Sequence, residues 1–157
     1  MGVEIERKFK VDEAVAKEYY QKAMNGEYQY KKIEQAYLTT NPVIRVRKSN
    51  DKYYMTYKGK GFVEREEYNL FLTEEAYSTL KSKADGNVIS KTRVIIPYES
   101  YTIELDIFDA PFDDLIVAEV EFDSVDAANS FDKPEWFMED VTEDRRYSNS
   151  YLSRMIL

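Results

Sequence analysis

Charged side chains recur two residues apart in six short segments of the chain. These segments are Glu4/Glu6 followed by Lys8, Arg45/Arg47, Arg65/Glu67, Lys91/Arg93, Glu104/Asp106 and Glu119/Glu121. Because successive side chains of a strand point to opposite faces, residues i and i+2 lie on the same face. Several segments carry apolar residues at the other positions, so the pattern predicts strands that share one ionic surface. If such a sheet curls into a barrel, this surface becomes a lumen suited to a polyanion together with a divalent metal.

The acid pairs near the two ends of the chain are candidates for metal binding. Two carboxylates two residues apart on a strand, such as Glu4 and Glu6, can ligate one hard cation or bridge two. Lys8 on the same face can contact a phosphate oxygen. An alternative for this segment alone is a solvated edge strand that uses charge against aggregation. Glu119 and Glu121 repeat the spacing near the last expected strand, and barrel closure would bring the two pairs together, which favours a metal site.

Two basic pairs, Arg45/Arg47 and Lys91/Arg93, are candidates for binding an anion. Like charges side by side on a strand repel, so each pair requires a bound anion or a facing carboxylate. Arginine offers paired donors that match the geometry of phosphate. Pairing with lumen carboxylates is the alternative, and the residues alone leave both open. A barrel that carries an apolar ligand would show the opposite parity of apolar and charged residues.

The composition limits the classes of partner. The length of 157 residues is typical of one domain, and we expect a single domain over residues 1–157. The net charge of −8 disfavours nonspecific binding of nucleic acid. The acids and bases assigned to the lumen cancel, so the outer surface carries this net charge and keeps the protein in solution. No signal peptide or membrane span is visible, so we expect a cytoplasmic protein with no membrane partner.

The sequence contains no histidine and no cysteine. Disulfides and thiolate catalysis are therefore excluded, and the commonest general base and metal ligand is missing. Any metal must be held by oxygen ligands, which points to magnesium, manganese or calcium rather than zinc.

Hydrophobic periodicity and turn signals predict about eight strands and two or three helices. The strands are expected at 2–11, 35–40, 43–48, 53–58, 64–72, 88–97, 101–108 and 115–122. Helices are expected at 12–24, 73–84 and 124–131, followed by a helical tail over 142–156. The short turns favour antiparallel pairing, so the expected fold class is α+β, dominated by a curled sheet.

The segment Glu4-Ile5-Glu6-Arg7-Lys8 resembles the ExExK signature of the CYTH superfamily, the triphosphate tunnel metalloenzymes. Further segments occur in that family's order, namely Gln35-Ala36-Tyr37-Leu38, Arg45-Val46-Arg47, Lys58, Arg65-Glu66-Glu67, Lys91-Thr92-Arg93, Glu104-Leu105-Asp106 and Glu119-Val120-Glu121. The stretch 141–149 is similar to the tail of the short bacterial members. Within it, Arg145, Arg146 and Tyr147 either close the site over substrate or anchor the last helix, and we favour anchoring. The resemblance covers essentially the whole chain.

This resemblance implies an eight-stranded antiparallel β-barrel, or tunnel, with flanking helices and a triphosphate-bearing substrate inside it. It implies Mg²⁺ or Mn²⁺ ligands at Glu4, Glu6, Glu119 and Glu121. It implies phosphate-binding residues at Lys8, Arg45, Arg47, Lys58, Arg65, Lys91 and Arg93. Residues expected to support these groups are Glu67, Glu104 and Asp106. Asn69 departs from the family, since many relatives carry a further acid at this position.

The family includes inorganic triphosphatases, thiamine triphosphatases, RNA triphosphatases and class IV adenylate cyclases. The length and the tail favour a metal-dependent hydrolase that converts inorganic tripolyphosphate to pyrophosphate and phosphate. Glu6 or Glu121 would activate the attacking water, and Lys8 would act at the reacting phosphate. The alternatives are a class IV-type adenylate cyclase, a thiamine triphosphatase, and a non-catalytic polyphosphate or nucleotide binder. The expected partner is thus a small polyanionic substrate rather than nucleic acid, and a homodimer stays open.

Overall fold

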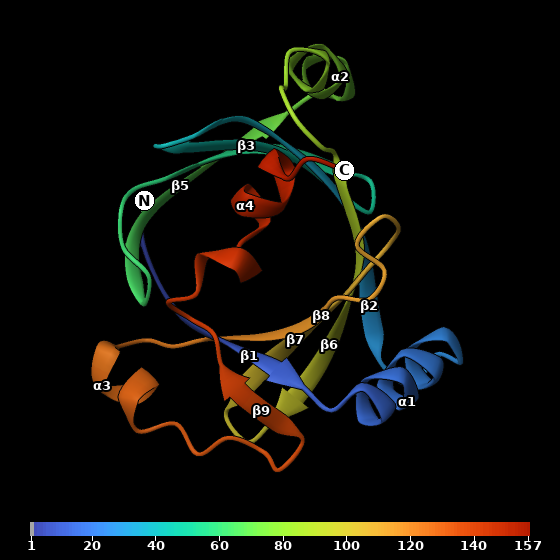
Figure 1. Cartoon of the computed structure of the whole chain (residues 1–157), viewed down its shortest axis with the longest axis vertical. Coiled ribbons are helices and arrows are strands. Elements are labelled where there is room, and N and C mark those ends of the chain that lie inside the picture. Colours follow the sequence, from blue (N-terminus) through green and yellow to red (C-terminus); the bar gives the residue numbers. More distant parts are fainter. Residues whose placement is uncertain (1) are drawn as a thin grey trace.

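Strands dominate the computed structural model, which describes residues 2–157, and most of them lie around one ring (Figure 1). The strands are β1 (Gly2–Val11), β2 (Gln29–Thr40), β3 (Val43–Ser49), β4 (Lys52–Lys58), β5 (Glu64–Leu72), β6 (Ile89–Tyr98), β7 (Tyr101–Phe108), β8 (Ile116–Glu121) and β9 (Phe137–Asp140). The helices are α1 (Glu13–Met24), α2 (Glu74–Ser82), α3 (Val125–Asn129), the 3₁₀ turn η1 (Arg145–Tyr147) and α4 (Asn149–Arg154).

The ring closes because β1 pairs with two different strands along its length. The sheet order is β5-β4-β3-β2-β6-β7-β8-β1-β9, and the N-terminal part of β1 also pairs with β5. All the pairings are antiparallel. Glu4 lies opposite Arg65 of β5, whereas Glu6 lies opposite Glu121 of β8. The expected eight-stranded antiparallel barrel with flanking helices is confirmed, and its closure brings the first and last strands of the barrel together.

The hydrophobic core lies on the outer side of the barrel strands. Phe9, Val94 and Leu105 are buried together with Ala16 and Ala23 of α1. These strand residues have the opposite parity to the charged residues of β1, β6 and β7, which point inward. The helices therefore cover the apolar outer face, while the interior stays ionic. This is the reverse of a barrel that carries an apolar ligand.

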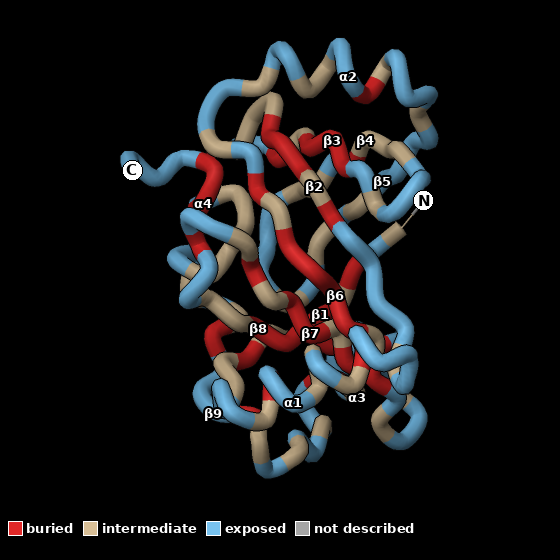
Figure 2. The backbone as a smooth tube through the Cα atoms, turned by 90° about the vertical axis from the view of Figure 1, so that its right-hand side faces the viewer, coloured by how far each residue is buried: buried red, intermediate tan, exposed pale blue. Residues whose placement is uncertain are grey.

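The C-terminal helix α4 lies across one end of the ring, as Figures 1 and 2 show from two directions. Leu152 is buried in a cluster that includes Ile89 and Val117. The loop before β6 holds the helix from the other side, because the backbone N–H of Asn87 donates to the carbonyl of Ser153 over 2.7 Å. The end of the chain is thus docked on the barrel.

Most expected bounds agree with the structure to within about two residues, but three elements differ more substantially from the sequence-based prediction. β2 begins at Gln29, six residues earlier than expected. Residues 29–34 are mostly exposed and polar, so the sequence shows no strand pattern there, but they pair with β6. β9 was missed, since its four residues become a strand only by pairing with β1. The predicted helical tail 142–156 consists instead of η1 and the short α4. No helix within residues 2–157 combines the length and apolar character that crossing a bilayer requires.

Candidate active site

An ionic cavity of about 350 Å³ lies inside the ring. Every residue that the sequence assigns to metal or phosphate binding lines it, namely Glu4, Glu6, Lys8, Arg45, Arg47, Lys58, Arg65, Lys91, Arg93, Glu119 and Glu121. Of the three supporting acids, Glu67 and Glu104 also line the cavity. Asp106 lies behind it, with a side chain that is 1% exposed and paired with Lys91. The alternation of inward and outward residues along the strands therefore identified the interior surface.

Three carboxylates, which we call the acid cluster, converge at one side of the cavity. Glu4, Glu6 and Glu121 each offer an oxygen, and these oxygens all lie within 4.8 Å of one another. Burial raises the pKa of Glu6 to about 8, with further contributions from the charges of Glu119 and Glu4. Burial also raises the pKa of Glu121 to about 7. Within residues 2–157 only Glu4 of the three has a basic partner, Lys58, and a set of carboxylate oxygens suits a hard divalent cation.

Glu119 has different surroundings from the acid cluster. Its carboxylate lies 3.6 Å from the Lys8 Nζ and 3.4 Å from an Arg93 guanidinium nitrogen. Burial alone would raise the pKa of Glu119, but Lys8 and Arg93 hold it well below its ordinary range. Glu119 is therefore an ionised carboxylate surrounded by basic groups, and it lies two residues before Glu121 of the acid cluster on β8.

Several lumen bases already have carboxylate partners. The Lys58 Nζ lies 3.0 Å from Glu4, and the Lys91 Nζ lies 2.6 Å from Asp106. Arg93 also binds Asp106, over 2.7 Å from its Nε. Burial lowers the pKa of Lys91 to about 7 despite this acid, because its side chain has no exposed surface. These bases balance the acids of the lumen and are less available to a bound anion.

Three arginines, Arg45, Arg47 and Arg65, have no acidic partner within salt-bridge distance among residues 2–157, and we call them the unpaired arginines. Arg45 donates only to the Thr56 hydroxyl, over 3.2 Å, and the Nε atoms of Arg45 and Arg65 are buried without any hydrogen-bond partner. Burial lowers the pKa of Arg47, and neighbouring Arg45 adds to this effect. Buried donors without acceptors are rare, and both arginines line the cavity, where their guanidinium groups could bind an anion.

Sequence reasoning gave no binding role to Gln35, Tyr54 and Asn149. Tyr54 and Asn149 nevertheless line the cavity, and Gln35 contacts Arg47, which lines it. Gln35 accepts a 2.7 Å hydrogen bond from the Arg47 Nε, and the Tyr54 hydroxyl lies 3.4 Å from another nitrogen of Arg47. Asn149 lines the cavity from the C-terminal side. Gln35 and Asn149 both fall within family-like segments, which is the signal that could have indicated them. Because their side chains are uncharged, they do not belong to the alternation of charged and apolar residues that identified the other cavity residues.

Asn69, where many family members carry an acid, lies in a hydrogen-bond network next to the cavity. Its side chain accepts a hydrogen bond from the Thr56 hydroxyl and donates to Glu67 over 3.4 Å. A neutral amide therefore stands near Arg45, where an acid would give that arginine a partner.

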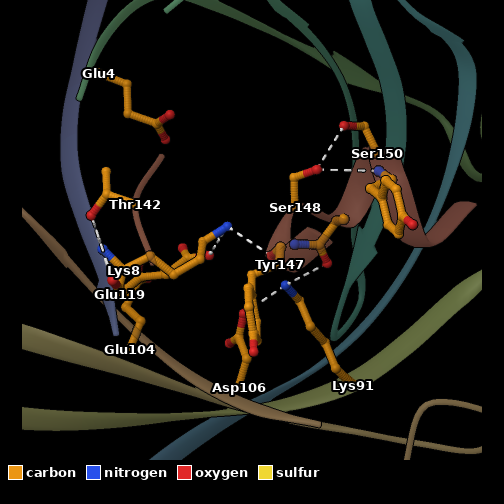
Figure 3. A network of polar contacts seen from close by, with 12 residues as sticks. Glu4, Lys8, Lys91, Glu104, Asp106, Glu119, Thr142, Tyr147, Ser148 and Ser150 are labelled. Atoms are coloured by element: carbon orange, nitrogen blue, oxygen red, sulfur yellow. Dashed lines mark hydrogen bonds and ion pairs between the residues drawn. The ribbon is translucent and has the colours of Figure 1, made fainter. Parts of the chain in front are cut away.

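The segment 145–147 reaches the cavity through its backbone rather than its side chains. The Lys8 Nζ donates to the Tyr147 carbonyl over 3.2 Å (Figure 3). Arg145 stacks over the Phe62 ring, 5.5 Å from its centroid, and Arg146 pairs with Asp144 over 2.6 Å. Neither guanidinium lines the ionic cavity. Arg145 does line an adjoining opening together with Glu6, Lys8 and Arg65, so anchoring stays a prediction.

Comparison with known proteins places this tunnel in a family. The model of the CYTH domain family matches residues 2–155. The chain belongs to the CYTH family. An inorganic triphosphatase from Nitrosomonas europaea is 36% identical over 137 residues, which cover 84% of this chain and 90% of that protein. An inorganic triphosphatase from Acetivibrio thermocellus is 35% identical over 156 residues, covering 97% and 94%.

A solved structure agrees with the CYTH assignment. The crystal structure of the inorganic triphosphatase NE1496 superposes with a TM-score of 0.66 at 34% sequence identity. The match covers 99% of this chain and 97% of that one. The CYTH tunnel thus accounts for the whole described structure rather than for part of it.

Proposed function

We propose that this protein is a metal-dependent hydrolase that converts inorganic triphosphate to pyrophosphate and phosphate. The observation that carries the proposal is the division of one cavity into an acid cluster and a set of unpaired arginines. A cation and a polyanion would each complete one of these two groups. The two relatives named inorganic triphosphatase, each aligned with most of this chain, support the same activity.

Magnesium or manganese is the cofactor that we propose, held by Glu4, Glu6 and Glu121 with Glu119 beside them. When bound, such an ion neutralises phosphate oxygens and lowers the pKa of a coordinated water. The raised pKa of Glu6 fits this role, because a cation would relieve the repulsion among neighbouring carboxylates.

The chain's own residues supply binding and proton transfer. The unpaired arginines would bind the nonbridging phosphate oxygens through paired N–H donors. Lys8, which donates to Tyr147 at the edge of the site, would contact the terminal phosphoryl group. Glu6 or Glu121 would accept a proton from water as the water oxygen attacks the terminal phosphorus in line. The bond from that phosphorus to the bridging oxygen breaks, and pyrophosphate leaves.

The test is phosphate release from tripolyphosphate, ATP and thiamine triphosphate, each with magnesium, with manganese and with EDTA. We expect metal-dependent release that is strongest with tripolyphosphate. Assay of cyclic AMP in the ATP samples separates a cyclase from a hydrolase. Cyclic AMP without phosphate release, or binding without any turnover, would overturn the proposal.

A further inference from the structure

The C-terminal helix places one amide inside the ionic cavity. The Asn149 Oδ1 accepts a 2.7 Å hydrogen bond from the Gln35 Nε2 and a 3.1 Å hydrogen bond from the Lys91 Nζ. Gln35 and Lys91 belong to β2 and β6, and both are fully buried. Figure 3 shows Lys8 and Lys91 approaching the tail near Tyr147 and Ser148 from different strands. A single side chain of the tail thus connects two strands of the tunnel.

The directions of these hydrogen bonds follow from the donors available. In its ammonium form Lys91 can only donate, and Asn149 presents its oxygen to it. That oxygen then faces the amide nitrogen of Gln35, which leaves the Gln35 Oε1 as the acceptor for the Arg47 Nε at 2.7 Å. Gln35 and Arg47 lie directly opposite each other on β2 and β3. Asn149 is therefore connected to Arg47 through the amide of Gln35.

We propose that Asn149 is a positioning residue that holds Arg47 in its phosphate-binding orientation through Gln35. This inference rests on the proposed function, since it assigns Arg47 to triphosphate. With Nε occupied by Gln35 and a second nitrogen donating to the Tyr54 hydroxyl over 3.4 Å, the Arg47 guanidinium is held at the wall of the cavity. Without the Asn149 oxygen, the buried amide nitrogen of Gln35 loses its acceptor, and the hydrogen bond from Arg47 alone holds the Gln35 side chain.

The docking of the tail does not depend on Asn149. Asn87 holds α4 through its side-chain amide, which donates to the carbonyls of Leu152 and Met155 over 3.0 and 2.8 Å. Leu152 is also buried in the barrel. Loss of the Asn149 side chain should therefore leave the helix in place and disturb the two side chains that donate to it, Lys91 and Gln35, and through Gln35 also Arg47.

The experiment is a double-mutant cycle between Asn149→Ala and Arg47→Ala. We expect Asn149→Ala to raise the KM for tripolyphosphate about tenfold, the effect of one hydrogen bond to a charged group, with kcat changed by less than about threefold. In the Arg47→Ala background the same substitution should have almost no further effect on KM. Asn129→Ala, an exposed asparagine of α3, is the matched control and should behave like the wild type.

A second variant covers the case in which Asn149→Ala does not fold. Gln35→Met keeps an unbranched side chain of similar length but removes both ends of the amide, and we expect the same rise in KM. Calorimetric binding of tripolyphosphate in EDTA measures Arg47 positioning without turnover. If the wild type does not hydrolyse tripolyphosphate but binds it more tightly than the Asn149→Ala variant does, the proposed function is wrong and the positioning role stands. A KM unchanged by Asn149→Ala, or an effect that adds fully to Arg47→Ala, would overturn the positioning role.

Discussion

Arg45 and Arg93 line the same cavity with very different partners. Arg93 contacts Asp106, Glu104 and Glu119, whereas Arg45 has only the Thr56 hydroxyl. Removing one partner of a buried ion pair is strongly destabilising, because the remaining charge stays buried alone. The two arginines should thus respond differently to the same truncation.

We predict that Arg93→Ala lowers the free energy of unfolding by about 3–5 kcal/mol, the range for breaking a buried pair. Arg45→Ala should cost far less stability, since no carboxylate loses a partner. It should instead raise the KM for tripolyphosphate about 10- to 100-fold, as expected for loss of hydrogen bonds to a charged group. Urea unfolding and steady-state kinetics on both variants check this. Equal losses of stability, or an unchanged KM in Arg45→Ala, would contradict it.

The charged residues of the cavity could be predicted individually, but their pairing could not. Parity along each strand is a local property, so it identified Glu119 and Glu121 as inward-facing residues. Which of the two joins Glu4 and Glu6 depends on contacts across the barrel. The structure places Glu121 in the acid cluster and Glu119 beside Lys8. Contacts of this kind join residues more than a hundred positions apart, and no spacing in the sequence specifies them.

Among the elements, the docked tail should be sensitive to a small change in the loop before β6. Gly86 has a φ of +110°, and a Cβ there would lie 2.2 Å from the carbonyl oxygen of Ser153 in α4. Gly26 also has a positive φ, of +87°, but a Cβ there would meet nothing within 4 Å. Comparing alanine substitutions at the two glycines therefore separates a steric clash with the tail from the cost of a positive φ, which both positions share.

We predict that Gly26→Ala lowers the free energy of unfolding by about 1–2 kcal/mol, from left-handed backbone alone. Gly86→Ala should cost about 1–3 kcal/mol more, because the tail must move away. Hydrogen exchange over 149–154 should accelerate only in Gly86→Ala. Equal losses in the two variants, with unchanged exchange in the tail, would show that the contact with Ser153 is unimportant.

Strands with a clear alternation could be predicted from the sequence, and elements held by distant contacts could not. β7 was placed at its observed bounds because Ile103, Leu105 and Ile107 alternate with its acids. β9 has no such pattern and exists through its pairing with β1 at Phe9 and Val11. The shape of the tail likewise depends on the barrel surface that it covers.

At the scale of the whole molecule, the metal-free protein carries an electrostatic cost that depends on pH. Glu6 has a pKa of about 8 and Glu121 of about 7 in the fold, against about 4.5 for an ordinary glutamate. Between pH 5 and pH 7 the folded state therefore binds more protons than the unfolded chain. Under this condition the free energy of unfolding falls as pH rises.

We predict that in EDTA the melting temperature decreases from pH 5 to pH 7. Magnesium should raise it more at pH 7 than at pH 5, because the ion must displace protons from the acid cluster. The range stops at pH 7, since Lys91, with a pKa lowered to about 7, adds an opposite slope that starts about one pH unit below that value and grows above it. Glu6→Gln, which removes one of the titrating groups, should flatten the decrease. A melting temperature that rises from pH 5 to pH 7 in EDTA would contradict this account.

The ionic inner face could be predicted because six strands carry charged residues at one parity. The closed eight-stranded barrel was implied by the resemblance to the CYTH family, since parity alone does not specify that a sheet closes. The assignment of residues 1–157 to a single domain stays a prediction, as does a homodimer.

The most direct test compares the wild type with Glu6→Gln for phosphate release from tripolyphosphate over a titration of magnesium. The substitution keeps the shape of the side chain and removes one carboxylate from the acid cluster. We predict that turnover falls at least about 100-fold at every magnesium concentration, with the thermal stability of the fold retained. A Glu6→Gln variant that hydrolyses tripolyphosphate at the wild-type rate would contradict the central claim, that the acid cluster of this tunnel carries the reaction.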